Sequence, residues 1–274
     1  HKLTSKKQDD ILDFRSEAKR GSTNMDKKCK EITLKYYSKW LGEEAVFEED
    51  RGKIVPVYSE ERNRIQSGYG QPFSLYVFCG ENKIIISYGD GYKKEIPHFV
   101  GKISDEMPVE QIKAVMEESF GKQVNHNIKY VFDKMSDFGN NARLLEDSDY
   151  DKYEIFFKSN NPNCSNIDWL PDYFQEMVQE KTCIGVFEQD QLACCTDAPT
   201  MPFMKEFVQE IGITTLEKYR KKGYASEACS RCVKEILNQG KIPLWSTGIG
   251  NTASQKLAEK VGFTKLADVL TLSL

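Results

Sequence analysis

Histidine is scarce in this sequence of 274 residues, with only His1, His98 and His126. Long apolar runs are also absent: the longest, Leu75–Cys79, is far shorter than the roughly 20 residues that a membrane-spanning helix needs. Positive charge is not in excess, because 38 Lys and Arg face 42 Asp and Glu, for a net charge of −4. These absences argue against a membrane protein and against a generic nucleic-acid binder, which needs a basic surface.

Eight cysteines are present, and an even number invites a disulfide interpretation. The chain is long enough to bury a core without such bonds, and it shows no signal peptide. Cys194 and Cys195 are neighbours in an apolar stretch, so on a strand they face opposite ways. Cys229 and Cys232 form a CxxC with no second pair and no nearby histidine, which favours core packing. We therefore predict a reduced, cytoplasmic protein without a metal site.

The composition, 39% apolar and 29% charged, fits one large domain or two ordinary ones. We predict a polar extension over residues 1–24 and an amino-terminal α/β domain of unassigned role over residues 25–135. That domain carries a helix with Ile32, Tyr36 and Trp40 on one face, and a hairpin of 74–79 with 83–88. A helix after Pro108 and a strand over 128–132 complete it. The polar stretch 135–141 is the predicted boundary, so the second domain covers residues 136–274.

The second domain has a regular order of expected elements. A short strand over 142–145 precedes two helices, over 147–158 and from Pro171 to Val178. Strands over 182–187 and 192–196 should pair antiparallel around a polar turn. A third strand, 207–215, contains Gly212, and glycine in a central strand indicates a bulge or a close approach of a ligand to the backbone.

A basic turn and a long helix follow the third strand. Ala225, Ala228, Cys229 and Cys232 begin a continuous apolar stripe that predicts a helix ended by Gly240. Residues 216–222 carry a charge of +3 within a chain of −4, and Gly223 lets a phosphate approach the backbone. Unpaired N–H groups and the helix dipole make this helix start suitable for a phosphate or pyrophosphate. A solvated basic turn that merely caps the helix explains the same residues equally well.

The rest of the sequence adds a second motif. A strand over 243–247 is followed by Asn251, a short helix, and Gly262-Phe263 before a last strand. In this order the chain resembles the GNAT superfamily of N-acetyltransferases, which bind acetyl-coenzyme A. Its pyrophosphate motif is matched by Arg220, Gly223 and Ala225. Its later motif is matched by the set Asn251, Ser254, Leu257, Gly262 and Phe263.

The resemblance covers residues 142–274 and implies an α/β (α+β) GNAT fold: a mixed, mostly antiparallel central sheet flanked by helices. Here the amino-terminal α/β domain is additional. The implied co-substrate is acetyl-coenzyme A, with its pantetheine arm in a wedge between the third strand and the strand over 243–247. The residues expected to bind it are Ile213, Thr214, Thr215, Arg220, Lys221, Lys222, Gly223, Tyr224, Ala225, Asn251 and Ser254.

The resemblance also implies direct attack of an amine on the thioester, with backbone N–H groups stabilising the oxyanion. The expected base is Glu210, with deprotonation through water as the competing possibility. Many relatives have a tyrosine after the position of Leu257 that protonates the leaving thiolate, but here that residue is Ala258. Tyr219 or Tyr224 could replace it, or the thiolate leaves without a dedicated acid.

The expected function is therefore N-acetylation of a small-molecule amine, without nucleic acid, membrane or metal, by a monomer or homodimer. The carboxyl-terminal stretch of the chain, together with the additional amino-terminal domain, also resembles a two-domain bacterial subgroup that includes zwittermicin-A-resistance acetyltransferases. Two alternatives stay open: a coenzyme A-binding sensor or interaction protein without catalysis, and an acetyltransferase acting on a protein amino group. Charged tRNA as an acceptor is disfavoured by the net charge of −4.

Overall fold

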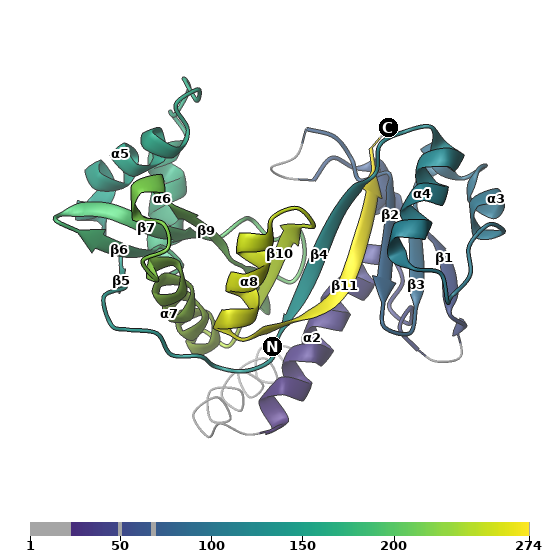
Figure 1. The fold of residues 1–274 in the computed structure, drawn as a ribbon, viewed down its shortest axis with the longest axis horizontal. Helices are drawn as coiled ribbons and strands as arrows, with labels where there is room; N and C mark the ends of the chain where they lie inside the picture. The colour runs from purple at the N-terminus through teal and green to yellow at the C-terminus, as the bar shows by residue number, and fades with distance from the viewer. Residues whose placement is uncertain (1–22, 49–50, 67–69, 274) are drawn as a thin grey trace, which may run out of the picture.

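The computed structural model describes residues 23–48, 51–66 and 70–273. Within these ranges two sheets form: a seven-stranded sheet in the order β1-β3-β2-β11-β4-β10-β8 and a four-stranded sheet in the order β5-β6-β7-β9. They occupy opposite sides of the molecule in Figure 1, with α8 between them. The expected mixed α/β fold with a mostly antiparallel central sheet flanked by helices is confirmed. The predicted extension over 1–24 lies almost wholly outside the described residues.

The amino-terminal half begins with a long helix and supplies four strands to the larger sheet. These are α2 (Thr23–Leu41), β1 (Ile54–Tyr58), β2 (Leu75–Gly80), β3 (Ile84–Tyr88) and β4 (Asn125–Phe132). The expected helix and the expected hairpin are both present, and β2 pairs antiparallel with β3. Of the strands, β1 was not predicted. It runs parallel to β3 at the end of the sheet.

Helices cover both faces of this sheet because the side chains of its strands alternate. On one face Tyr76, Phe78 and Ile85 pack in the same core as α2. On the other face, Val77 and Ile86 pack with α3 (Ile96–Val100) and α4 (Val109–Phe120). The period-two alternation of a strand thus separates two apolar clusters. Figure 1 shows α2 along one face and α3 and α4 on the other.

The carboxyl-terminal half forms the smaller sheet and then returns to the larger one. It contains β5 (Arg143–Leu144), α5 (Tyr150–Asn160), α6 (Leu170–Gln179), β6 (Ile184–Glu188), β7 (Gln191–Asp197), β8 (Val208–Glu210), β9 (Gly212–Thr215), α7 (Tyr224–Asn238), β10 (Ile242–Gly248), α8 (Thr252–Val261) and β11 (Phe263–Leu272). Cys194 and Cys195 pack in different clusters, which confirms that they face opposite ways. Cys229 and Cys232 are fully buried in the core, as predicted.

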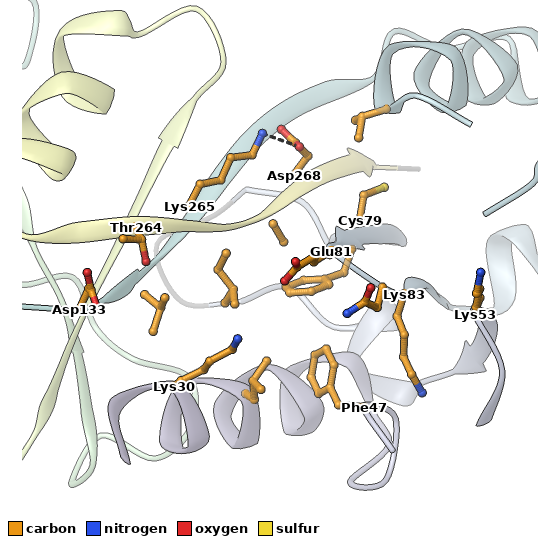
Figure 2. Close-up of a pocket in the computed structure, with 18 of the residues that line it drawn as sticks. Lys30, Phe47, Lys53, Cys79, Glu81, Lys83, Asp133, Thr264, Lys265 and Asp268 are labelled. Atoms are coloured by element: carbon orange, nitrogen blue, oxygen red, sulfur yellow. Dashed lines mark ion pairs between the residues drawn. The ribbon is translucent and has the colours of Figure 1, made fainter. Parts of the chain in front are cut away.

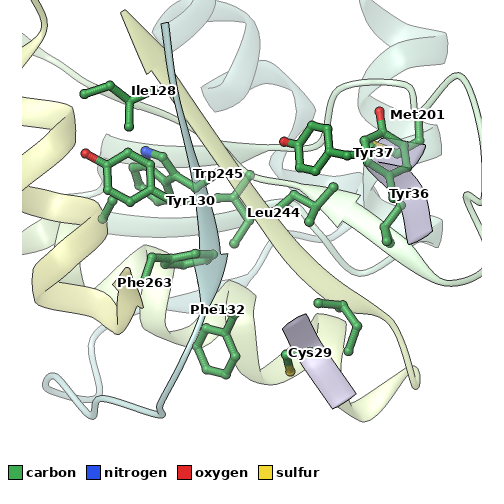
Figure 3. Packing of buried hydrophobic residues seen from close by; sticks show 14 of the residues in the cluster. Cys29, Tyr36, Tyr37, Ile128, Tyr130, Phe132, Met201, Leu244, Trp245 and Phe263 are labelled. Carbon is green, nitrogen blue, oxygen red and sulfur yellow. The ribbon is translucent and has the colours of Figure 1, made fainter. Parts of the chain in front are cut away.

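Hydrogen bonding within the larger sheet crosses the predicted boundary at residue 136. β4 lies between β10 and β11 and pairs antiparallel with both, and β11 also pairs with β2. The buried side chains of Tyr130, Trp245 and Phe263 come together there from three different strands (Figure 3). Residues 133–142 do connect the two sheets, but strands from both sides of the boundary share one core. Two independent domains therefore stay a prediction.

Candidate active site

One stretch of chain changes sheets at Ile211. β8 pairs parallel with β10, from Val208 opposite Ile242 to Glu210 opposite Leu244. The Ile211 N–H then donates to the Leu244 carbonyl at 3.0 Å, after which β9 pairs antiparallel with β7. The sequence-based expectation of a single strand over 207–215 was thus wrong, because its two halves find partners in different sheets. β9 and β10 diverge beyond this point, which is the wedge that the sequence predicts.

The backbone of β9 faces both ways across this divergence. Leu216 N–H donates to the Ala193 carbonyl at 3.0 Å, and the register places Thr214 opposite Cys195. In an antiparallel pair, every second residue bonds to its partner strand. Residues 212, 214 and 216 therefore face β7, whereas Ile213 and Thr215 direct their N–H and carbonyl groups toward the wedge. Two of the three predicted β9 residues can offer backbone N–H groups to a ligand there.

The turn before α7 leaves the start of the helix open. Lys221 and Gly223 both have positive φ, 64° and 90°, and no side chain caps the helix. The first donations into the helix come from Ser226 and Glu227, both to the Gly223 carbonyl. The N–H groups of Tyr224 and Ala225 have no acceptor within the helix. A Cβ atom at Gly223 would meet nothing within 4 Å, so the glycine leaves free space for an anion.

The positive charges of this turn are unequally available. Lys222 forms an ion pair with Glu188 at 2.8 Å, and the Tyr224 hydroxyl also bonds to Glu188. These contacts, the Lys222 hydrogen bond first, lower the pKa of the Glu188 carboxyl. Arg220 and Lys221 are exposed and have no acidic partner among the described residues. They are the two cations of the predicted set that are free to meet a phosphate.

Asn251 and Ser254, the two co-substrate residues predicted from the second motif, both form hydrogen bonds within the protein. Asn251 caps α8, because its side-chain oxygen accepts from the Ser254 N–H at 3.1 Å. The Ser254 hydroxyl accepts from the indole N–H of the buried Trp245, also at 3.1 Å. Cofactor contacts by these two side chains therefore stay predictions.

Neither tyrosine expected to replace the missing acid points freely into the wedge. Tyr219 donates to the Gln191 side chain at 3.0 Å, and Tyr224 bonds to Glu188. Both partners belong to the β6–β7 hairpin. Ala258 itself is fully buried in the core.

The predicted base, Glu210, lies at the end of β8 where the two sheets separate. Its carboxylate accepts a hydrogen bond from the Ser246 hydroxyl of β10. Its charge also contributes to the raised pKa values of Tyr37 and Tyr76, after the larger effect of burial. Glu210 thus faces the side of the sheet that α2 covers, and its role as base stays a prediction.

A second carboxylate, Asp197, was not predicted from the sequence. It ends β7 opposite Gly212, and a Cβ atom at Gly212 would collide with its carboxylate. The close approach inferred at this glycine therefore comes from the protein itself. Burial, and then the charge of Glu210, raises the pKa of Asp197 from 3.8 to about 6. The one sequence signal for Asp197 was its place as an acidic residue at the end of an apolar strand. Its pairing with Gly212 of the neighbouring strand could not be inferred from the sequence.

Asp197 also borders a cavity of about 250 Å³ between the smaller sheet and the helices α5 and α6. Aromatic side chains from α5 and α6 contribute to its lining, and so does Thr214 of β9. It therefore adjoins the strand that borders the wedge. Its lining combines five aromatic residues with five polar ones, among them a carboxyl of raised pKa, and such a combination is typical of a small-molecule site.

A larger cavity of about 1100 Å³ lies elsewhere, between α2 and strands β2, β4 and β11 (Figure 2). Lys30 rises into it from α2, and Lys265 and Asp268 form an ion pair of 2.7 Å at its far side. None of the predicted cofactor residues lines it. Among the described residues, no group of His, Cys, Asp and Glu is arranged to hold a metal ion, and no helix could span a membrane.

Comparison with solved structures finds several acetyltransferases of low sequence identity. A GNAT-family acetyltransferase from Colwellia psychrerythraea is 18% identical, with a TM-score of 0.46, over 56% of this chain and 58% of its own. One from Novosphingobium aromaticivorans is 17% identical, with a TM-score of 0.42, over 54% and 64%. The chain thus spans about six-tenths of these two. A Salmonella typhimurium structure with its cofactor acetyl-CoA is 14% identical, with a TM-score of 0.40, over 48% and 91%.

No protein of curated function matches the sequence significantly. The family model described as GNAT acetyltransferase matches residues 108–268, which is more than half of the chain. The match contains the diverging strands β8 to β10, the turn before α7 and the α8 motif, and it begins before the predicted boundary at 136. The chain therefore belongs to the GNAT acetyltransferase family, whose members use acetyl-coenzyme A.

Proposed function

We propose that this protein transfers the acetyl group of acetyl-coenzyme A to the amine of a small molecule. The observation that carries the proposal is the separation of β9 from β10 after Ile211. The uncapped start of α7 follows β9 in the chain, after the turn of residues 216–223. The first feature offers an extended backbone edge, and the second offers N–H groups for a phosphate. A long ligand with an anionic end and a carbonyl at its other end fits both.

The pyrophosphate of the co-substrate would lie at the start of α7. The N–H groups of Tyr224 and Ala225 point to that place, and Arg220 and Lys221 add the free positive charges. The Cβ position of Gly223 is open, so no described residue fills the anion's space. Lys222 contributes less in this arrangement because Glu188 already neutralises it.

The thioester would lie along β9, where Ile213 and Thr215 direct backbone N–H groups away from β7. Such fixed donors polarise the carbonyl and stabilise the oxyanion that forms when the amine attacks. The amine must first lose a proton, so a base is required. Two carboxylates, Glu210 and Asp197, flank the start of the wedge, and the charge of Glu210 raises the pKa of Asp197.

A small-molecule acceptor is favoured by the small cavity beside Asp197. A protein amino group would need an open groove for the neighbouring residues, whereas a cavity of about 250 Å³ suits a compact amine. The resemblance to the zwittermicin-A-resistance subgroup makes amine-bearing antibiotics one class to include among the acceptors. Ala258 is buried and cannot donate a proton as the tyrosine of many relatives does, and this is its one argument for the sensor alternative.

The test combines binding with turnover. Calorimetry should detect coenzyme A, and release of free thiol from acetyl-coenzyme A should depend on the added amine. Glu210→Gln should lower kcat while leaving coenzyme A affinity unchanged. Binding without turnover on a broad amine panel would instead support the sensor, and absence of binding at millimolar coenzyme A would overturn both.

A further inference from the structure

We propose that the cavity beside Asp197 binds the acceptor as an organic ammonium ion with an apolar body and no carboxylate or phosphate, and that Asp197 takes the proton of that ion. This inference rests on the proposed acetyl transfer and adds the class of acceptor. It depends on three features of the described residues: the aromatic lining, a single charged group, and contact with the wedge through β9.

Five aromatic side chains from the two helices line the cavity. Its aromatic lining is Tyr153, Phe156 and Phe157 from α5, with Trp169 and Tyr173 from the start of α6. Phe157 and Trp169 meet edge to face with centroids 5.5 Å apart, and Trp169 and Tyr173 do so at 5.6 Å. Trp169 is 46% exposed, whereas Phe156 is buried. Rings arranged in this way bind apolar groups and attract cations over their faces.

The electrostatic character of the cavity favours a cation. Asp197 is the only charged side chain among the described residues that line it. Asn160 and Asn161 donate their amide N–H groups at 2.9 Å to the carbonyls of Phe156 and Phe157, so their amide oxygens stay available as acceptors. An ammonium group finds acceptors in such a lining. A carboxylate or phosphate on the same molecule would face the Asp197 charge with no cation in the lining to balance it.

The cavity and the wedge share one strand, β9. Asp197 stands opposite Gly212, the first residue of β9, and Thr214 also lines the cavity. Ile213, between them, directs its backbone away from β7 into the wedge. An amine held against Asp197 is therefore one strand away from the predicted thioester position. Gly212 permits this geometry, because any side chain there would collide with the carboxylate.

The proton balance of the step is complete without a further reactant. The ammonium gives one proton to the Asp197 carboxylate, and the amine nitrogen then bonds to the thioester carbonyl carbon. The carbon–sulfur bond breaks, and the thiolate takes the second proton of the former amine to give free coenzyme A. Asp197 returns its proton to solvent. The net products are an amide, a thiol and one released proton.

Several titratable groups are close enough to influence Asp197. The Asp197 charge acts on Tyr153 of α5, Tyr173 of α6, Cys195 of β7, and Cys229 and Cys232 of α7, while the charge of Glu210 of β8 acts on Asp197. Burial raises the pKa of both tyrosines, of Cys229 and of Cys232, and the hydrogen bond with Cys183, followed by burial, raises the pKa of Cys195, so these groups stay neutral near pH 7. The charge of Glu210 acts in the same direction as burial and raises the pKa of Asp197. It favours the protonated carboxyl of Asp197 and so helps that residue accept a proton.

A matched pair of acceptors tests the class. 2-Phenylethylamine and phenylalanine share the aromatic body and the amine, but only phenylalanine carries a carboxylate. With the full chain and acetyl-coenzyme A, we expect kcat/KM for 2-phenylethylamine to exceed that for phenylalanine at least tenfold. Calorimetry in the presence of coenzyme A should show binding of the amine alone. Equal use of both compounds, or no binding of 2-phenylethylamine at millimolar concentration, would overturn the inference.

Variants test the cavity and the proton separately. Phe157→Ala should raise KM for 2-phenylethylamine more than it lowers kcat, while Ile155→Ala, exposed on the same helix, should change neither. Asp197→Asn should lower kcat/KM at least tenfold and remove an acidic limb near pH 6 from its pH profile. Asp172→Asn, an exposed acid of α6, is its control. An acidic limb retained in Asp197→Asn would show that Asp197 does not take the proton.

These outcomes separate the inference from the function on which it rests. Suppose that other amines release thiol, but that 2-phenylethylamine and phenylalanine are used equally or 2-phenylethylamine does not bind. The proposed acetyl transfer would then be supported, and the proposed acceptor class would be wrong. If no amine in the panel releases thiol, the proposed function itself falls.

Discussion

The indole N–H of Trp245 donates to the hydroxyl of Ser254 at 3.1 Å, and this bond joins β10 to α8. Trp245 is 1% exposed, so its N–H has no access to water. Ser254 in turn donates its backbone N–H to the Asn251 side chain. A short motif that the sequence associates with a cofactor thus holds the helix to the strand beside the wedge.

Ser254→Ala should lower the free energy of unfolding by about 1 kcal/mol, because it leaves the buried Trp245 donor unpaired. Urea unfolding followed by tryptophan fluorescence measures the change. Thr252→Ala, an exposed residue of the same helix, is the control. A loss of coenzyme A affinity with unchanged stability would show that Ser254 serves the co-substrate instead.

Gly223→Glu should weaken coenzyme A binding at least tenfold, or about 1.4 kcal/mol. The substitution adds a side chain and a negative charge at the open start of α7, where the pyrophosphate is proposed to bind. Calorimetric titration with coenzyme A measures it. Gly121→Glu is a matched control, because Gly121 also has positive φ and open space, but follows the distant α4. An equal affinity in both variants would place the phosphates elsewhere.

Asp197→Asn should stabilise the fold at neutral pH. The pKa of Asp197 rises from 3.8 to about 6 in the folded chain, so the folded state holds a proton that the unfolded chain releases. The ionised Asp197 carboxyl therefore lowers the free energy of unfolding. This effect is absent below pH 4, grows between pH 4 and 6, and is complete above pH 6. Replacement by neutral Asn should raise the free energy of unfolding by ~1 kcal/mol at pH 7.5.

The measurement for Asp197 is urea unfolding of the variant and the parent protein at pH 4.5 and pH 7.5. The stabilisation should be smaller at the lower pH. An identical difference at the two values would mean that a contact other than the titrating carboxyl is responsible.

Arg62→Met should retain most of the stability, whereas Arg62→Ala should lose about 2 kcal/mol or more. The fully buried guanidinium lies 4.3 Å from the Trp40 ring centroid and donates to the Trp40 carbonyl at 3.0 Å. Its Nε and Nη1 atoms have no hydrogen-bond partner in the described part of the chain, and burial lowers its pKa to about 10. Packing of the side chain, not its charge, is therefore what the core requires.

The Arg62 variants are compared by chemical unfolding at one pH. Arg64→Met, which removes an exposed neighbour, should change the free energy of unfolding by less than about 0.5 kcal/mol. A larger loss in Arg62→Met than in Arg62→Ala would contradict the explanation.

Local periodicity was sufficient to predict most elements. The apolar stripe that begins at Ala225 is α7, and the residues around Gly80 form the predicted hairpin of β2 and β3. The signals for these elements lie within the elements themselves, as spacing on one helix face or as two apolar runs around a polar turn. The turn at Gly223 was found for the same reason.

Features that depend on distant partners could not be predicted in this way. Nothing near Ile211 in the sequence says that β8 and β9 join different sheets, because that choice depends on β7 and β10. The place of Asp197 in the candidate site likewise depends on its contact with Gly212 and on the aromatic residues of α5 and α6. β4 reads as an ordinary strand, although it pairs with β10 and β11 more than a hundred residues later.

The position of β11 has a consequence for the order in which the protein can fold during synthesis. β11 hydrogen-bonds to β2 on one side and to β4 on the other, so it is the only bridge between these two strands in the described sheet. β2 and β4 leave the ribosome long before it. Until residues 263–272 emerge, β2 and β4 each have unpaired backbone N–H and carbonyl groups along the edge that β11 later covers. Such exposed strand edges can pair with other chains. Slow translation or early termination should therefore expose this protein to aggregation.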